Sequence, residues 1–199
     1  MQIWKGEIDE YFKFTKIEKG EKVLEYDINN LFKDKFGCIL LRQGQDDVSS
    51  PYLMNGSVGV ASVLLRYYLY TNKIKYKYIT IDIMNSLENS LSLHTGLFEG
   101  MSGIANVFLD CYFIIGDDLY LNIANRIALD ISNSLYNNDG FVSGYSRDGK
   151  NLSFTFDYGS SGVVMFLNRL LKNNKYNFIP YLDKEMEEIS EQNIKKSNQ

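Results

Sequence analysis

Three long apolar runs divide this chain, and each follows two glycines that stand three residues apart. The residues after each second glycine are apolar on nearly every side of a helix, which is typical of buried helices. The pattern therefore predicts three buried helices that begin in the same way. Their starting glycines are Gly56 and Gly59, Gly100 and Gly103, and Gly159 and Gly162.

More amphipathic segments alternate with these runs. Residues 117–136 place Leu119, Ile123, Ile127 and Ile131 four residues apart, with Asp117 or Asp118 as the N-cap. Residues 76–93 are similar but less regular. Alternating buried and outer helices predict an all-α fold, a partial α/α toroid or solenoid of inner and outer helices.

The two ends of the chain differ from the repeats. Residues 1–48 mix charges with β-formers, and we expect them to pack on helical repeats over 49–199 within one domain. Residues 36–41 predict either a short strand or a buried helical turn. Residues 139–158 predict a hairpin or a long loop, and Pro180 predicts the first turn of a last, highly charged helix.

The paired glycines predict a close approach of backbone. Two glycines one helical turn apart remove the side chains from one face of the first turn, where the helix also has free N–H groups. Because glycine costs about 1 kcal/mol against alanine inside a helix, its repeated use at one place indicates a shared architectural need.

Charge and composition exclude several classes of partner. The net charge is −4 and the pI about 5.1, which argues against nucleic acid and against anionic membrane. No apolar stretch is long enough to span a membrane, and acidic and basic residues interrupt the start of the chain where a signal peptide would be apolar. Cys38 and Cys111 form no disulfide framework, so we expect a cytoplasmic protein, with Cys111 as a small core residue.

The three glycine motifs and their flanks resemble the LanC-like family, the cyclase domain of lanthionine synthetases. The resemblance covers about residues 50–172 and is greatest to the fused kinase–cyclase type, class III, found in bacteria. It implies a toroid of seven inner and seven outer helices. This chain carries only three of the glycine motifs at which such inner helices begin. We therefore expect either a C-terminal piece or a chain whose missing helices come from elsewhere. The segments that carry the resemblance are 50–59, 96–103 and 156–162.

The zinc ligands of the family have no counterparts here. Zinc-bearing members place a cysteine two residues before one motif glycine, and Cys-His just before the next. Mapped by the glycines, these positions hold Met54, Phe98 and Glu99. This set does not suit Zn²⁺, so we expect no metal and no cofactor.

Four residues near the motifs are candidates for catalysis. His94 is the only histidine and the candidate base, or else a partly exposed loop residue. Glu99 occupies a former ligand position and faces the toroid centre, unless it merely pairs with an arginine. Asp157 and Tyr158 precede the third motif, and Tyr158 could protonate an enolate or simply pack at the rim.

Other polar residues have weaker claims. Tyr145 and Arg147 could bind substrate peptide or belong to an ordinary solvated loop. Arg66, Asp110 and Arg169 recur at one repeat position, which we interpret as helix-end structure.

The resemblance implies an addition of a peptide cysteine thiol to a dehydroamino acid, here without zinc. The partners would be a precursor peptide, and a kinase or lyase chain or the missing half of the toroid. One alternative is a non-catalytic scaffold that grips the peptide or the kinase. A weaker one is a carbohydrate-active toroid, for which Glu99 and Asp157 are the carboxylate pair.

Overall fold

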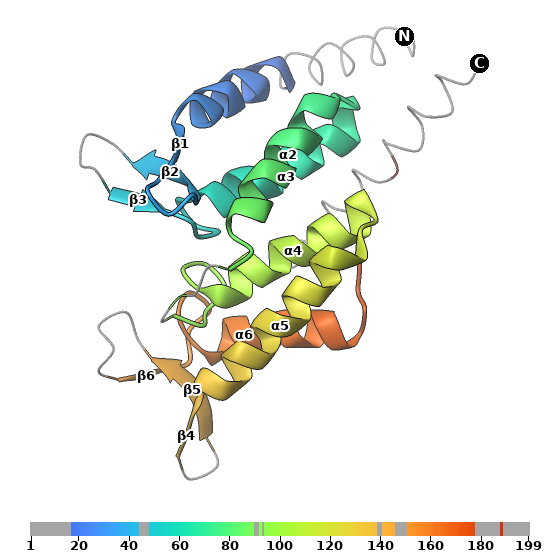
Figure 1. Cartoon of the computed structure of the whole chain (residues 1–199). Coiled ribbons are helices and arrows are strands. Elements are labelled where there is room, and N and C mark those ends of the chain that lie inside the picture. Colours follow the sequence, from blue (N-terminus) through green and yellow to red (C-terminus); the bar gives the residue numbers. More distant parts are fainter. Residues whose placement is uncertain are drawn as a thin grey trace, which may run out of the picture.

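The computed structural model describes residues 17–43, 48–89, 92, 94–138, 141–145, 151–177 and 188. Helices dominate this part of the chain, and two small antiparallel sheets flank them (Figure 1). A mostly helical fold with short strands is what the sequence predicted. None of the described helices is long and apolar enough to cross a lipid bilayer.

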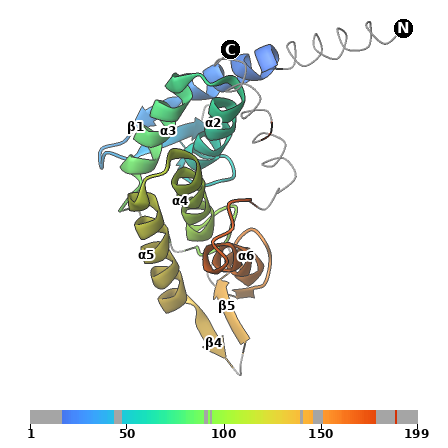
Figure 2. The ribbon, with the colours of Figure 1, turned by 90° about the vertical axis from the view of Figure 1, so that its right-hand side faces the viewer.

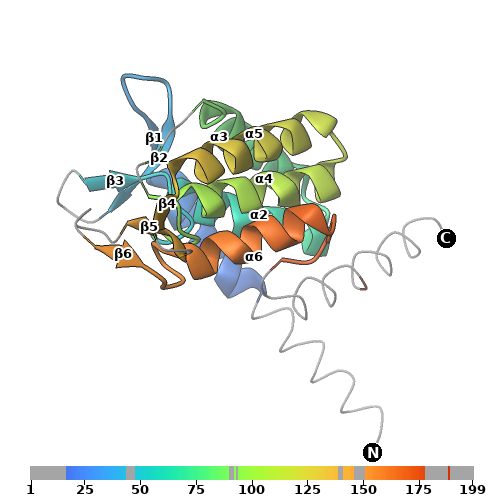
Figure 3. The same ribbon diagram turned by 90° about the horizontal axis from the view of Figure 1, so that it is seen from below.

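Three helices begin directly after the first glycine of a motif and form the inner layer. They are α2 (Ser57–Thr71), α4 (Met101–Ile115) and α6 (Ser160–Leu171). Two outer helices follow the first two, α3 (Ile74–Ser86) and α5 (Asp118–Ser134). Figure 3 shows α3 and α5 on one side of α4 and α2, so the alternation of inner and outer helices is confirmed.

Residues in the left-handed backbone conformation end two inner helices, and the chain turns back there into the outer helix that follows. Asn72 (φ 55°) ends α2 and Gly116 (φ 84°) ends α4, and each donates its N–H to the last turn of its helix. Asp117 then caps α5, because its carboxylate accepts the N–H of Leu119 at 2.9 Å. The predicted cap of this helix is confirmed, while its predicted end at residue 136 is two residues beyond the observed one.

The N-terminal part of the described chain packs on α2 and α3. A helix over 17–29 precedes a sheet of three strands, β1 (Leu31–Lys33), β2 (Ile39–Gln43) and β3 (Val48–Ser50). The register pairs Phe32 with Leu40 and Arg42 with Ser49. Of the two predictions for residues 36–41, the strand is the correct one for Ile39–Leu41.

A second three-stranded sheet lies between α5 and α6. Its strands are β4 (Tyr136–Asn138), β5 (Phe141–Tyr145) and β6 (Leu152–Ser153), in the order β4-β5-β6. The predicted hairpin of residues 139–158 is therefore confirmed where the structure describes it. The helix predicted from Pro180 lies outside the described residues. Figures 2 and 3 show β5 at the end of the bundle where α6 begins.

The buried core runs along α4. Every residue of α4 from Met101 to Cys111 is buried, as its all-round apolar pattern predicted. Phe108 stacks on Tyr120 of α5 with ring centroids 6.1 Å apart. Burial raises the pKa of Tyr120 to about 12, so its phenol stays neutral and packs as an uncharged group.

Candidate functional site

Three loops that precede the inner helices lie side by side and share one hydrogen-bond pattern. We call residues 51–56, 94–100 and 154–159 the first, second and third motif loops. The N–H of Met54 donates to the Phe98 carbonyl at 2.9 Å, and the N–H of Phe98 donates to the Asp157 carbonyl at 3.3 Å. All three residues stand two positions before a motif glycine. The loops are therefore joined in repeat register.

The second glycine of each motif leaves room for the loop before it. A Cβ on Gly59, Gly103 or Gly162 would overlap the carbonyl oxygen of the residue three positions before the first glycine. On Gly162 it would also meet the backbone N and Cβ of Leu97 in the neighbouring loop. The predicted close approach of backbone is confirmed, and the backbone that approaches belongs to the motif loops.

The same loops occupy the free donors at the helix starts. The N–H of Val58 donates to the Pro51 carbonyl at 3.2 Å, and the equivalent N–H of Ser102 donates to the Thr95 carbonyl at 3.2 Å. The N–H of Met101 donates to the His94 carbonyl at 2.9 Å. Carbonyl groups of the motif loops therefore accept these N–H groups, and the bonds fix the position of each loop on its helix.

His94, Glu99 and Tyr158 come together at this stack of loops. The Tyr158 hydroxyl donates to Oε2 of Glu99 at 2.9 Å. The ring of His94 meets that of Tyr158 edge to face, with centroids 5.6 Å apart. All three are half-buried. The cluster thus unites an imidazole, a phenol and a carboxylate from the second and third loops.

Two buried polar atoms at this cluster have no hydrogen-bond partner among the described residues. They are Nδ1 of His94 and Oγ1 of Thr95. Thr95 also lies against Gly144 of β5, since a Cβ on that glycine would overlap Oγ1 and approach the Tyr158 carbonyl. The second sheet is therefore packed directly against the cluster. The sequence did not single out Thr95, although it adjoins His94.

Asp157 joins the site mainly through its backbone. Its carbonyl accepts the N–H groups of Phe98 and Glu99, at 3.3 and 3.4 Å. Its side chain is half-buried. The interloop bond shows that Asp157 holds in the third loop the position that Phe98 holds in the second, while a catalytic role for its carboxylate stays a prediction.

The two predicted peptide-binding residues are less defined. Tyr145 is the last residue of β5, paired in register with Leu152 of β6, and its neighbour Gly144 contacts the site. Arg147 lies outside the described residues. Peptide binding by either residue stays a prediction.

The positions that correspond to metal ligands do not fit a zinc ion. Met54 and Phe98 are joined by backbone, and neither side chain offers a thiolate or an imidazole. Glu99 is engaged by Tyr158. Within the described residues no three His, Cys, Asp or Glu side chains group as metal ligands would.

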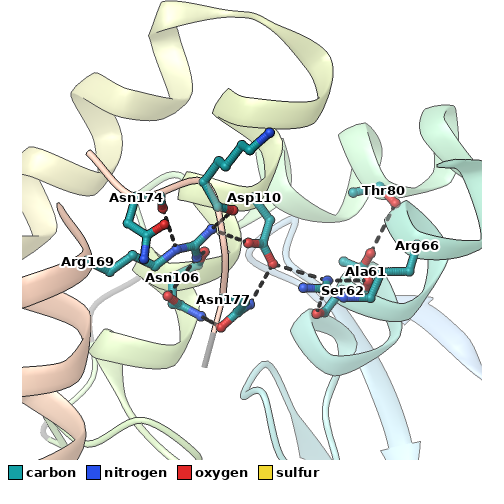
Figure 4. Close-up of polar contacts among 10 residues, drawn as sticks. Ala61, Ser62, Arg66, Thr80, Asn106, Asp110, Arg169, Asn174 and Asn177 are labelled. Atoms are coloured by element: carbon teal, nitrogen blue, oxygen red, sulfur yellow. Dashed lines mark hydrogen bonds and ion pairs between the residues drawn. The ribbon is translucent and has the colours of Figure 1, made fainter. Parts of the chain in front are cut away.

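A buried ion network crosses the inner helices farther from the loops (Figure 4). Asp110, only 2% exposed, accepts from Arg169 at 2.7 Å and from Arg66 at 3.2 Å. Arg169 also donates to Oδ1 of Asn106 at 2.7 Å. Asn177 donates to Asp110 at 2.9 Å and accepts from Asn106 at 2.6 Å. The network ties the segment after α6 to α4.

The interpretation of these three residues as helix-end structure holds for Arg169, which lies in the last turn of α6, and is wrong for Arg66 and Asp110, which lie inside α2 and α4. Each stands ten residues after its first motif glycine, and the three side chains meet because neighbouring inner helices lie in register. A carboxylate between two guanidinium groups needs no helix end. Complementary charge at one repeat position was the signal that sequence reasoning missed.

Comparison with known proteins identifies a family for this chain. The model of the family described as lanthionine synthetase C-like protein matches residues 47–199. No curated protein matches the chain. The matched range begins just before the first motif loop and contains all three inner helices.

Proposed function

Because this chain belongs to the lanthionine synthetase C-like family, we propose that it is a zinc-independent cyclase module of lanthipeptide biosynthesis, of the class III type. The observation that carries the proposal is the cluster of His94, Glu99 and Tyr158 at the motif loops. We infer from the resemblance that the reaction centre lies at these loops. Acid–base side chains there would ionise the thiol, which zinc does in zinc-bearing members of the family.

The proposed reaction is an addition that conserves mass. A cysteine thiol of the peptide loses its proton, and its sulfur forms a bond to the β-carbon of a dehydroalanine or dehydrobutyrine. The C=C π electrons move to give an enolate, which gains one proton at the α-carbon. Only a few per cent of a free thiol is ionised at pH 7, so a base at the site raises the rate.

Each member of the cluster takes one role in this scheme. His94 accepts the thiol proton, since an imidazole is the side chain suited to proton transfer near neutral pH. Tyr158 donates its hydroxyl proton to the enolate, and His94 then returns a proton to the phenolate. Glu99 is a positioning residue, because the bond that it accepts holds the Tyr158 phenol at the site until the hydroxyl rotates about its C–O bond towards the enolate.

We also propose that the three motif helices supply part of a toroid. A partner chain or a further domain would complete it, and a kinase or lyase would supply the dehydrated peptide. The precursor peptide is then the substrate.

The test uses the full chain and a synthetic peptide that holds one dehydroalanine and one cysteine. Ring formation leaves the mass unchanged but removes the thiol, so alkylation followed by mass spectrometry separates substrate from product. We expect the alkylated species to disappear faster with the protein than without it. Equal rates of thiol loss with and without the protein would contradict the proposal.

A scaffold that binds the peptide without chemistry is a second candidate, and the apolar residues Met54 and Phe98 at the ligand positions favour it. The variants His94→Ala and Glu99→Ala separate the two. If the chain is a scaffold, the parent and both variants bind the peptide with the same affinity and none of them cyclises it. If the chain is a cyclase, the parent forms the ring and the variants do not.

A further inference from the structure

The site loops carry large apolar side chains that remain exposed. Met54 in the first loop is 37% exposed and Phe156 in the third is 39% exposed. Phe98 in the second loop is half-buried. Single exposed apolar residues are ordinary on protein surfaces, so what matters here is whether these three are joined.

A ring contact joins Phe98 to Phe156, and a backbone hydrogen bond joins Met54 to Phe98 across the stacked loops. The ring of Phe98 meets that of Phe156 at a tilt, with centroids 6.0 Å apart. Met54 bonds by its N–H to the carbonyl of Phe98, at the equivalent position of the neighbouring repeat. We call these three residues the apolar platform.

The apolar platform adjoins the reacting cluster along the chain. Glu99 follows Phe98 directly, and Tyr158 stands two residues after Phe156. The bond from Tyr158 to Glu99 and the ring contact of Phe156 with Phe98 therefore connect the same two loops.

Several backbone groups of the loops already bond between loops. They are the N–H groups of Met54, Leu97 and Phe98 and the carbonyls of Phe98 and Phe156. Apolar contact with the exposed side chains is therefore a means by which a peptide gains affinity here. Contiguous exposed apolar surface is the kind that marks a binding site.

We propose that the apolar platform of Met54, Phe98 and Phe156 binds an apolar residue flanking the dehydrated residue of the precursor peptide. This inference rests on the proposed function and names the sequence class of substrate that the site prefers. The platform holds the flanking side chain, and the dehydrated residue then lies beside Glu99 and Tyr158.

Binding of unreactive peptides tests the inference without any chemistry. Two labelled peptides contain dehydroalanine and an alanine in place of cysteine, with either leucine or asparagine next to the dehydroalanine. Fluorescence anisotropy with the full chain measures both affinities. We expect the leucine peptide to bind about tenfold more tightly, since one buried leucine side chain is worth at least that factor. Equal affinities would overturn the inference.

Variants place the preference on the platform. Phe156→Ser and Phe98→Asn should each reduce the preference to less than about twofold, in line with the apolar area removed. Leu129→Ser is the matched control, because Leu129 is an exposed apolar residue of α5 outside the loops, and it should keep the full preference. Thermal melting shows that each variant folds. An unchanged preference in both folded platform variants would overturn the assignment.

The two proposals fail separately. If the matching cysteine peptide is cyclised without any leucine preference, the platform inference is overturned and the cyclase proposal stands. A leucine preference that depends on Phe98 and Phe156, without cyclisation, supports the platform and removes the cyclase.

Discussion

Tyr158 and Glu99 stand 59 residues apart, and the Tyr158 hydroxyl donates a 2.9 Å hydrogen bond to the Glu99 carboxylate. Each residue immediately precedes the first glycine of its motif. The bond therefore joins equivalent positions of neighbouring repeats. Its partners occupy the loops whose backbones are also bonded in register.

Removal of the Tyr158 hydroxyl should separate catalysis from folding. We expect Tyr158→Phe to lower the cyclisation rate by about 10²-fold, the usual worth of a positioned proton donor. The ring contact with His94 needs no hydroxyl, so thermal stability should change little. Tyr78→Phe on the exposed side of α3 is the control and should cyclise like the parent chain. A Tyr158→Phe variant of undiminished rate would remove Tyr158 from the mechanism.

The ion network should be critical for stability. Asp110→Asn leaves Arg169, 5% exposed, without its carboxylate partner. Loss of one partner of a buried pair costs about 3–5 kcal/mol of unfolding free energy, which urea denaturation measures. Asp82→Asn, on an exposed position of α3, should cost well under about 1 kcal/mol, as surface changes do. Equal small losses in both variants would show that the network is dispensable.

The second motif glycine should not tolerate a methyl group. A Cβ on Gly103 would overlap the Leu97 carbonyl, which the loop cannot easily move because Leu97 also bonds to Phe156. We expect Gly103→Ala to lose about 2 kcal/mol in urea denaturation, in the range of overpacking. Gly116→Asn is the matched control, since asparagine adopts the left-handed conformation and nothing lies within 4 Å of the added Cβ. If alanine at Gly103 were the better tolerated of the two, the account of the motif would be wrong.

The contact between the helix over 17–29 and α3 should weaken in acid. Burial alone would raise the pKa of Glu21, but hydrogen bonds from Lys73 and Tyr76 lower it below its ordinary value of 4.5. A lowered pKa in the folded state stabilises the protein above the ordinary value and is lost as the pH falls through the folded one. Glu21→Gln should therefore cost at most about 1 kcal/mol at pH 7 and less than that near pH 3. Urea denaturation at both pH values measures this, and an equal cost at each would contradict it.

Cys111 should resist alkylation in the folded chain. Burial, with the Asp110 charge beside it, raises the pKa of the thiol well above its ordinary value, which suppresses the reactive thiolate. Iodoacetamide at pH 8 should modify it only after denaturation, as peptide mapping would show. Rapid modification of native protein would contradict its place in the core of α4.

The repeat made much of the fold predictable, because glycine spacing and apolar runs are local signals. Gly100 and Gly103 predicted the start of α4, and Asp117 predicted that of α5. Residues 136–138 form a strand and not the end of a helix, since the pairing of Tyr136 with Ser143 overrides the local pattern. That pairing depends on a strand farther along the chain.

Side-chain partners were less predictable. Asp110 and Arg169 are separated by the same 59 residues as Glu99 and Tyr158, so one register accounts for both pairs. The sequence supplies that spacing, but not which faces of neighbouring inner helices meet. His94 joins the cluster through loop geometry, for which the glycine pattern has no signal.

Ring formation under metal-free conditions tests the central claim most directly. The full chain is dialysed against a chelator, metal content is measured, and thiol loss from a dehydroalanine–cysteine peptide is followed by alkylation and mass spectrometry. We predict that thiol loss stays faster than in the protein-free control and does not accelerate when zinc is restored. Thiol loss that falls to the protein-free rate with the chelator and returns with zinc would contradict the account.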